Sequence, residues 1–289
     1  MRENFLTRFL LVAPTQAMIW AVLVVPSVYL AWLSFHSSSF GADARFVGWE
    51  NYARILSDGY FWRALGNTAI VVLVVVHLEL LLGLGMALLF AQGLPFRRLL
   101  IACVLAPYAV SEVAAVVMWR FLFDPDVGHV SYLLNLLGLP GLEWAVTPAH
   151  GLVLVSLLSI WMHLPFTFMI LYAARLALPG EVYEAAKIDG ASVWQTFRNV
   201  TLPLLMPAML MAMLFRLIFA FRLFSEVWLL TGGGPARSTE VVAVYLYLEA
   251  FRYNAFGGAA ATGWIMVVAS LLMAAPYLWR LAKEQRGDA

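Results

Sequence analysis

Charge is what this sequence has least of: only 12% of its 289 residues are charged, whereas 63% are hydrophobic. A soluble domain has about 25% charged residues. So few charges could not cover the surface of a water-soluble globule of this size. The composition therefore predicts a membrane protein, and the length favours a single transmembrane domain over residues 1–289.

Several reactive groups are also scarce or missing. Cys103 is the sole cysteine of the sequence, so no intrachain disulfide and no multi-thiol metal site can form. The sequence has no Gly-x4-Gly-Lys-Ser/Thr phosphate loop, no His-x-x-x-His, no Gly-x-Ser-x-Gly and no paired catalytic aspartates. We therefore expect a chain that is not an enzyme, with no catalytic or metal-binding residues and no cofactor of its own. The net charge of +1 gives no indication of nucleic-acid binding.

Long apolar runs are what the sequence does have. A membrane-spanning helix needs about 20 apolar residues, and the Gly, Pro and Ser interruptions in these runs are tolerated when neighbouring helices satisfy the freed backbone groups. The first run exceeds the roughly 7–15-residue core of a cleaved signal peptide, so we expect it to be retained. The fold class predicted is an all-α membrane protein. Its six predicted spans cover residues 10–35, 67–91, 99–123, 151–174, 204–230 and 257–280.

The distribution of Lys and Arg predicts the orientation of the spans. Basic residues concentrate on the cytoplasmic side of a membrane protein, most strongly in short loops. Ten of the 18 Lys and Arg residues fall on one side of the six spans, six fall on the other, and two lie within span five. Both termini and the polar loop at residues 176–203 are therefore predicted to be cytoplasmic. The ten basic residues on that side are Arg2, Arg8, Arg97, Arg98, Arg175, Lys187, Arg198, Arg280, Lys283 and Arg286.

The polar loop begins with the pattern of a short helix. Pro179 and Gly180 end the preceding span. Glu181 and Glu184 then fall in the first helical turn, where acidic groups suit the positive end of the helix. Gly190 fits the stop that needs a positive φ. The pattern predicts a helix from about 181 to 189.

The rest of the polar loop predicts a second helix and a docking role. Ser192 can cap a short helix that runs through Phe197, and Pro203 opens span five where proline is well tolerated. Ala185 and Ala186 give the first helix a small apolar face that allows close approach. An amphipathic linker lying on the membrane would also explain this face, but not the ordered spacing of the loop.

That spacing resembles a known signature. Glu184-Ala185-Ala186, Gly190 after three more residues, and the run from Val200 to Leu202-Pro203 match the cytoplasmic loop of permease subunits of binding-protein-dependent ABC importers. Asp189 before the glycine strengthens the match. The resemblance implies the type I ABC importer permease fold and a multi-pass protein of the bacterial inner or plasma membrane. Loop 176–203 would then be the loop that couples the permease to an ATPase.

A second resemblance narrows the family to the maltose-type sugar permeases, and to the first of their two permease subunits. It rests on the turn from Leu230-Thr231 through three glycines to Pro235, and on Ser238-Thr239. The sequence around Phe215-Arg216 is most similar to members that handle disaccharides of the trehalose and maltose kind. The implied function is the membrane-spanning subunit of an ATP-driven importer of such a sugar.

The resemblance also implies partners and residue roles. The partners are a second permease subunit, two copies of an ATPase subunit that bind ATP and Mg²⁺, and a soluble binding protein that delivers the sugar. Glu184 is expected to pair with a basic group of the ATPase. Ala185 and Ala186 would permit close packing, Gly190 would permit the turn, and Asp189 and Pro203 complete the coupling set.

In this family the sugar lies between the two spans that flank the loop. The corresponding residues lie at helical spacing on one face of each span. Aromatic rings can stack on a sugar, and His and Arg can bond its hydroxyl groups. Glu112 and Arg222 join this set as intramembrane charges. The predicted substrate pathway consists of Ser159, His163 and Phe166 on span four, Arg216, Phe219, Leu223 and Arg222 on span five, and Glu112 on span three; Met162 shares the span-four face.

Three predictions concern the charges inside the bilayer. Glu112 could pair with Arg216, and Arg222 could pair with Glu226 one helical turn later. Glu79, near His77, is interpreted as structural. Two other functions stay open: a glycerol-phosphate or polyol importer of the same family, for which two intramembrane arginines would suit an anion, and an ion-coupled secondary carrier. The carrier would leave the docking loop unexplained.

Overall fold

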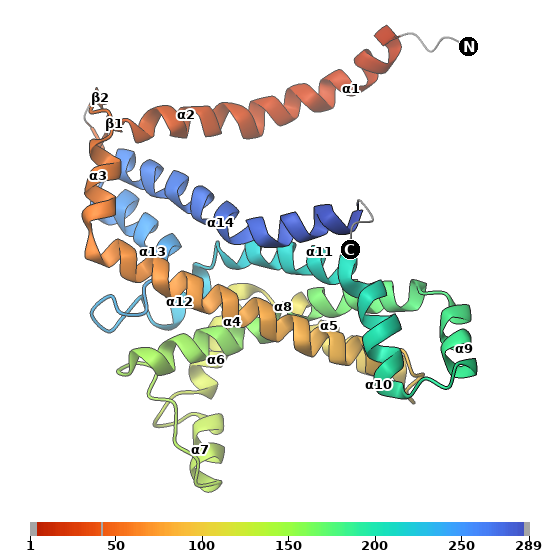
Figure 1. Cartoon of the computed structure of the whole chain (residues 1–289). Helices are drawn as coiled ribbons and strands as arrows, with labels where there is room; N and C mark the ends of the chain where they lie inside the picture. The colour runs from red at the N-terminus through yellow and green to blue at the C-terminus, as the bar shows by residue number, and fades with distance from the viewer. Residues whose placement is uncertain (1–4, 42, 286–289) are drawn as a thin grey trace. The chain divides into compact units, whose positions relative to one another are not determined.

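The computed structural model describes residues 5–41 and 43–285, and most of these residues are helical (Figure 1). Arg2 and Arg286, counted above with the cytoplasmic side, lie outside the described residues. The internal contacts group the chain into two units. Unit 1 holds the chain up to Trp62 together with Tyr245–Val268, and unit 2 holds Arg63–Val244 and the chain from Ala269 onward.

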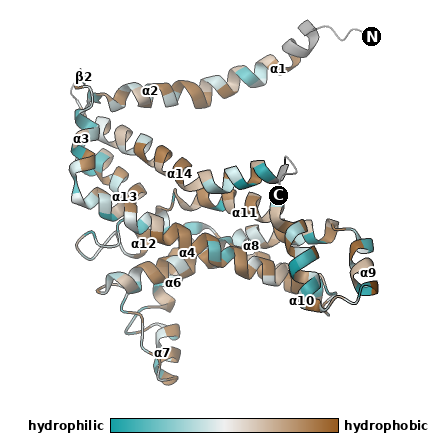
Figure 2. Ribbon diagram, viewed as in Figure 1, coloured by the Kyte–Doolittle hydropathy of each residue, from teal (hydrophilic) through white to brown (hydrophobic). Residues whose placement is uncertain are grey.

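Five helices among the described residues are long and apolar enough to cross a membrane, and one bent helix pair makes a sixth crossing if it counts as one span. This confirms the all-α membrane fold. Hydrophobic residues dominate these helices, as Figure 2 shows clearly for α4. The five helices are Leu11–Ser34, Gly59–Phe90, Pro148–Ala177, Val193–Ala220 and Phe256–Lys283, and the bent pair is Arg97–Ala109 with Glu112–Leu122.

Unit 1 contains the first span and the short elements that follow it. A π-helical turn joins α1 to α2 just before Pro26, whose missing N–H would interrupt a regular helix. His36 pairs with Phe46 in a two-stranded antiparallel ribbon. The elements are α1 (Phe5–Ile19), η1 (Trp20–Val24), α2 (Val25–Ser34), β1 (His36–Ser37), β2 (Arg45–Phe46), α3 (Glu50–Ser57), η4 (Leu248–Arg252) and the first part of α14 (Phe256–Gln285).

Charged and polar pairs hold α3 in place within unit 1. Arg54 donates two hydrogen bonds to the carboxylate of Glu249, at 2.6 and 3.3 Å. This partner raises the pKa of Arg54, so the guanidinium stays charged. Asn51 donates from its amide to the backbone oxygens of Ser34 and His36, at 2.9 and 3.0 Å. These contacts fasten α3 to the end of α2 and to η4.

The start of α14 packs so closely in unit 1 that only glycine fits there. A Cβ atom on Gly257 would overlap the backbone oxygen of His36, whereas one on Gly263 would lie 3.6 Å from Leu246, an ordinary contact. We expect Gly257→Ala to lower the free energy of unfolding by about 1–3 kcal/mol, as overpacking does. Gly263→Ala on the same helix is the matched control, and thermal melting of the detergent-solubilised protein compares them. Equal melting temperatures for the two variants would contradict the close packing.

Unit 2 holds the helices that build the functional site. Helix α8 forms its centre: it packs along α11 and contacts α6 and α12. Gly83 of α4 lets the backbone of α8 approach closely, because a Cβ there would lie 3.0 Å from Thr167. The elements are α4 (Gly59–Phe90), α5 (Arg97–Leu105), η2 (Ala106–Ala109), α6 (Glu112–Leu122), α7 (His129–Leu136), α8 (Pro148–Ala177), α9 (Gly180–Ile188), α10 (Val193–Thr196), η3 (Phe197–Thr201), α11 (Leu202–Ala220), α12 (Ser225–Leu230), α13 (Val242–Tyr247) and the second part of α14. The first turn of α4 and the end of α13 belong to unit 1.

Span three differs from the straight helix predicted at 99–123. Helices α5 and α6 meet at an angle of 99°. The break follows from the local sequence: Pro107 lies in the 3-10 turn η2, and Ser111 then caps α6 by accepting a hydrogen bond from the N–H of Ala114 at 3.2 Å. A cap of this kind starts a new helix rather than continuing the old one.

Span five also differs from its predicted limits of 204–230. The helical run Val193–Ala220 is continuous and ends ten residues earlier than predicted. Its 28 residues already extend about 42 Å at 1.5 Å per residue, which is enough to cross a bilayer. The second short helix of the polar loop is therefore part of span five. The π-helical turn η3 precedes Pro203 and accommodates its missing N–H inside the run.

Candidate functional site

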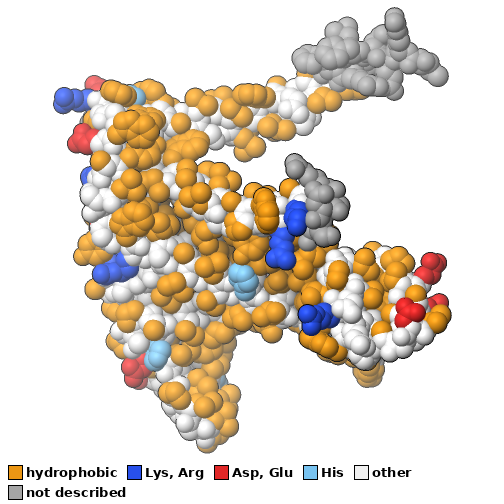
Figure 3. Space-filling view, in the orientation of Figure 1, with side chains coloured by type: hydrophobic (Ala, Val, Ile, Leu, Met, Phe, Trp, Pro, Cys, Tyr) orange, Lys and Arg blue, Asp and Glu red, His pale blue; other side chains and the backbone are white. Residues whose placement is uncertain are grey.

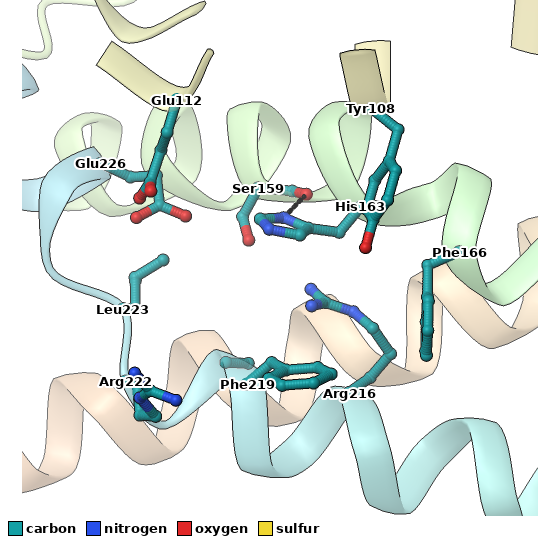
Figure 4. A pocket seen from close by; sticks show the side chains of 11 residues that line it. Tyr108, Glu112, Ser159, His163, Phe166, Arg216, Phe219, Arg222, Leu223 and Glu226 are labelled. Atoms are coloured by element: carbon teal, nitrogen blue, oxygen red, sulfur yellow. Dashed lines mark hydrogen bonds between the residues drawn. The ribbon is translucent and has the colours of Figure 1, made fainter. Parts of the chain in front are cut away.

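A cavity of about 310 Å³ lies between the helices of unit 2. It collects all eight residues that the sequence analysis assigned to a substrate pathway, although they come from three separate spans (Figure 4). Met162 is buried and does not line the cavity, so it packs within the protein. The lining consists of Tyr108, Glu112, Ser159, His163, Phe166, Arg216, Phe219, Ala220, Arg222, Leu223 and Glu226.

Hydrogen-bond donors gather at one end of the cavity, where Arg216, His163 and Tyr108 converge (Figure 4). The Nδ1 atom of His163 lies 2.9 Å from the backbone oxygen of Ser159. A carbonyl oxygen can only accept, so Nδ1 carries a proton and the neutral ring keeps Nε2 as an acceptor. This end of the cavity therefore offers donors from Arg216 and Tyr108 beside an acceptor on His163.

The predicted ion pair between Arg216 and Glu112 does not form, because Arg216 pairs with another residue. Its guanidinium donates two hydrogen bonds to Glu79 of α4, from Nε at 2.5 Å and from Nη2 at 2.8 Å. The side chains of Arg216 and Glu79 are only 3% and 0% exposed. Glu79 thus neutralises the arginine from outside the cavity lining, which agrees with its structural interpretation. The two partners are 137 positions apart in the sequence, so helical spacing could not predict that they meet.

Two carboxyl groups face each other at the opposite end of the cavity. Glu112 lies in the first turn of α6, Glu226 lies in the first turn of α12, and both carboxyl groups point to the same place in the cavity (Figure 4). The predicted pair of Arg222 with Glu226 is wrong. It assumed one continuous helix through 230, whereas the helix ends at Ala220 and α12 begins at Ser225. The break turns Glu226 towards Glu112.

Aromatic rings complete the cavity. Phe166 of α8 and Phe219 of α11 meet edge to face, with ring centroids 6.1 Å apart. Phe219 keeps 48% of its surface exposed, so it has a free face for a ligand. Three lining residues were not predicted from the sequence: Tyr108, Ala220 and Glu226. Tyr108 enters the cavity because of the break between α5 and α6, and Glu226 enters it because of the break between α11 and α12. Pro107 and Ser111 are the sequence signals that could have indicated the first break.

The polar loop forms the second candidate site, built around α9. Tyr183 fastens α9 to the rest of the chain: its ring stacks under the guanidinium of Arg175 at 4.3 Å, and its hydroxyl bonds Thr201 at 3.2 Å. Ala186 is only 7% exposed, so it packs within this chain. Ala185 and Glu184 are exposed on the other side of the helix. Acidic side chains gather at this tip of unit 2, as Figure 3 shows.

The turn after α9 has the geometry that the glycine pattern predicts. Gly190 has a φ of +73°, and its N–H donates to the oxygen of Lys187 at 3.1 Å. Asp189 precedes it as the exposed C-terminal cap of α9. Ser192 and Gln195 then form a reciprocal capping box that starts α10. The loop is therefore a preformed helix, turn and helix with an exposed outer face.

The two alanines of α9 give a prediction. We expect Ala186→Leu to lower the melting temperature of the solubilised chain, because the added atoms have no space inside it. Ala185→Leu should leave the melting temperature unchanged, because Ala185 is exposed, and should weaken assembly with a subunit that docks on this face. Melting curves and co-purification with an ATPase subunit measure the two effects. A destabilised Ala185→Leu variant with normal assembly would reverse the assignment of the faces.

Comparison with known proteins decides the family. The family model of the binding-protein-dependent transport system inner membrane component matches residues 79–279. The chain belongs to this family. The matched range contains both the cavity and the polar loop, so the resemblance seen in the loop sequence is confirmed.

Similar permeases narrow the class. The trehalose/maltose transport system permease protein MalF of Thermococcus litoralis is 34% identical, over 86% of this chain and 83% of its own length. The trehalose transport system permease protein SugA of Mycobacterium tuberculosis is also 34% identical, over 84% of this chain and 78% of its own. The sulfoquinovosyl glycerol transport system permease protein SmoG of Agrobacterium fabrum reaches 34% over 93% of this chain and 88% of its own.

A solved structure shows the same fold. A subunit of a bacterial ABC transporter involved in the import of the acidic polysaccharide alginate superposes with a TM-score of 0.78 at 22% identity, over 96% of both chains. The permease is thus a multi-span inner-membrane subunit of a sugar ABC importer of the maltose/trehalose type. Its relatives are transport permeases, which agrees with a chain that is not an enzyme.

Proposed function

We propose that this permease moves a disaccharide of the trehalose or maltose kind through the cavity of unit 2. The observation that supports this most is the chemistry of the lining. Phe166 and Phe219 offer rings for the apolar faces of a sugar, while His163, Arg216 and the carboxyl groups offer partners for its hydroxyl groups. Ligand sites generally combine an apolar surface with a few placed polar groups in this way.

The permease would work as one of two membrane subunits. A second permease completes the pathway, two ATPase subunits bind ATP and Mg²⁺, and a soluble binding protein delivers the sugar from outside. The bias of Lys and Arg supports a cytoplasmic location for both termini and for α9. From there α9 would dock on an ATPase subunit with its exposed face, where Glu184 is free to meet a basic group.

Coupling would follow from how α9 is attached. Tyr183 connects α9 to Arg175 at the end of α8 and to Thr201 just before α11. These two helices carry Ser159, His163, Arg216 and Phe219 of the cavity. A movement of α9 driven by closure of the ATPases would thus reach both walls of the cavity and switch it between inward-facing and outward-facing states.

A glycerol-phosphate or polyol importer would share the motifs of the loop. The two intramembrane arginines favour an anion less than the sequence suggested, because Arg216 is already neutralised by Glu79. An ion-coupled carrier works without an ATPase subunit, so that alternative does not explain the exposed outer face of α9. The ligand profile of the cognate binding protein, read out as stimulated ATPase activity of the full complex, tests the substrate. Stimulation by trehalose or maltose is expected, and stimulation by phosphate esters alone would overturn the disaccharide assignment.

A further inference from the structure

The cavity carries an unusual set of charges for a sugar site. Five ionisable side chains line it besides Tyr108: Glu112, Glu226, His163, Arg216 and Arg222. The charge of Arg216 is neutralised by Glu79, and the Nδ1–H of His163 is directed to the Ser159 oxygen. The charge that a substrate meets is therefore set by Arg222 and by Glu112 with Glu226, which we call the carboxyl pair.

The two members of the carboxyl pair differ in how far a substrate can reach them. Glu226 is 3% exposed, whereas Glu112 is exposed and lies in the first turn of α6, where acidic groups suit the positive end of the helix. Glu112 is therefore the carboxyl group that a substrate meets, and Glu226 lies beside it as a second, buried carboxyl group.

Resting on the function proposed above, we propose that the carboxyl pair is the specificity-determining element of the cavity, which admits neutral, hydroxyl-rich sugars and excludes anionic ones. The carboxylate of Glu112 accepts hydrogen bonds from sugar hydroxyl groups, and Glu226 adds a second carboxyl group beside it. A phosphate, carboxylate or sulfonate group on a substrate would face the same negative charge. Hydrogen bonds between hydroxyl groups and an ionised acceptor are also the stronger kind.

The residues next to the carboxyl pair agree with this preference for neutral sugars. Arg222 is exposed, and Leu223 lies between it and the carboxyl pair (Figure 4). Leu223 thus separates the charge of Arg222 from the carboxyl pair, so a substrate group at this end of the cavity meets the carboxyl groups. The fold alone does not decide whether the substrate is neutral or anionic, because a solved structure with this fold belongs to a transporter of the acidic polysaccharide alginate. The side chains of this cavity make the choice.

Equilibrium binding to the assembled permease and ATPase complex in nanodiscs, without the binding protein, tests the proposal directly. The probes are trehalose and maltose as neutral sugars and their phosphate esters as anions. The wild-type complex is expected to prefer the neutral sugars by about tenfold or more, since like charges brought together in a site are strongly unfavourable. Glu112→Gln, an isosteric change at an exposed side chain, should remove most of that preference.

Two further variants sharpen the result. Glu226→Ala removes the second carboxyl group beside Glu112 and should weaken neutral-sugar binding by about tenfold. Glu143→Gln, an exposed carboxyl outside the cavity, is the matched control and should bind as the wild type does. An unchanged preference in Glu112→Gln, or equal binding of sugars and esters by the wild type, would overturn the specificity role alone. If the wild type bound neither kind of probe while its ATPase subunits remained active, the proposed function itself would be wrong.

Discussion

Replacing Gly190 by proline is expected to abolish sugar uptake while the permease remains in the membrane. Gly190 ends α9 with a φ of +73°, which proline cannot adopt because its ring fixes φ near −65°. Proline also lacks the N–H that donates to Lys187. The turn would open, and α9 would no longer present Glu184 and Ala185 at a fixed angle. Uptake into vesicles measures the loss, and membrane extraction measures insertion.

Gly93 provides the matched control for this variant. It has a φ of +81° and open space around it, as Gly190 has, but lies in the loop between α4 and α5. Gly93→Pro carries a similar backbone strain outside α9, so uptake should continue. Normal uptake by Gly190→Pro would refute the coupling role of the polar loop. Equal loss in both variants would indicate a general effect of strain instead.

Breaking the ion pair between Glu79 and Arg216 is expected to have the largest effect on stability. Removing one partner of a buried pair leaves an uncompensated charge and costs about 3–5 kcal/mol. Glu79→Leu should therefore lower the melting temperature of the solubilised permease sharply, since Arg216 is left charged and 3% exposed. Thermal unfolding in detergent, followed by size-exclusion chromatography, measures this effect.

The double variant separates stability from transport. Glu79→Leu with Arg216→Met removes both charges and fills the space with apolar atoms, so most of the stability should return. Uptake should stay low, because Arg216 also supplies donors to the cavity. A double variant that regains both stability and uptake would show that Arg216 serves the fold alone.

The spans and the polar loop could be predicted because their signals are local. Apolar runs of sufficient length fix the number of crossings, and the spacing of Glu184, Gly190 and Pro203 lies within a single loop. The positive φ of Gly190 and the cap at Ser192 both follow from residue type. Helical spacing on α8 and α11 also brought Ser159, His163, Phe166, Arg216 and Phe219 onto one cavity.

The charge pairs could not be predicted because they depend on where helices break and on which spans meet. Arg222 and Glu226 are one turn apart only if the helix continues past Ala220, and it does not. Glu79 and Arg216 meet because α4 lies against α11, which no local pattern reports. The place of Glu226 in the cavity lining was therefore missed, although it lies beside Glu112.

Transport by the reconstituted permease tests the central claim most directly. Vesicles containing this chain with its partner permease and ATPase subunits would be given the loaded binding protein and labelled trehalose or maltose. The account predicts uptake that requires ATP on the side of the membrane where the ATPase subunits lie. This uptake should continue when all ion gradients are collapsed. Uptake by this chain alone, driven by an ion gradient and indifferent to ATP, would contradict it.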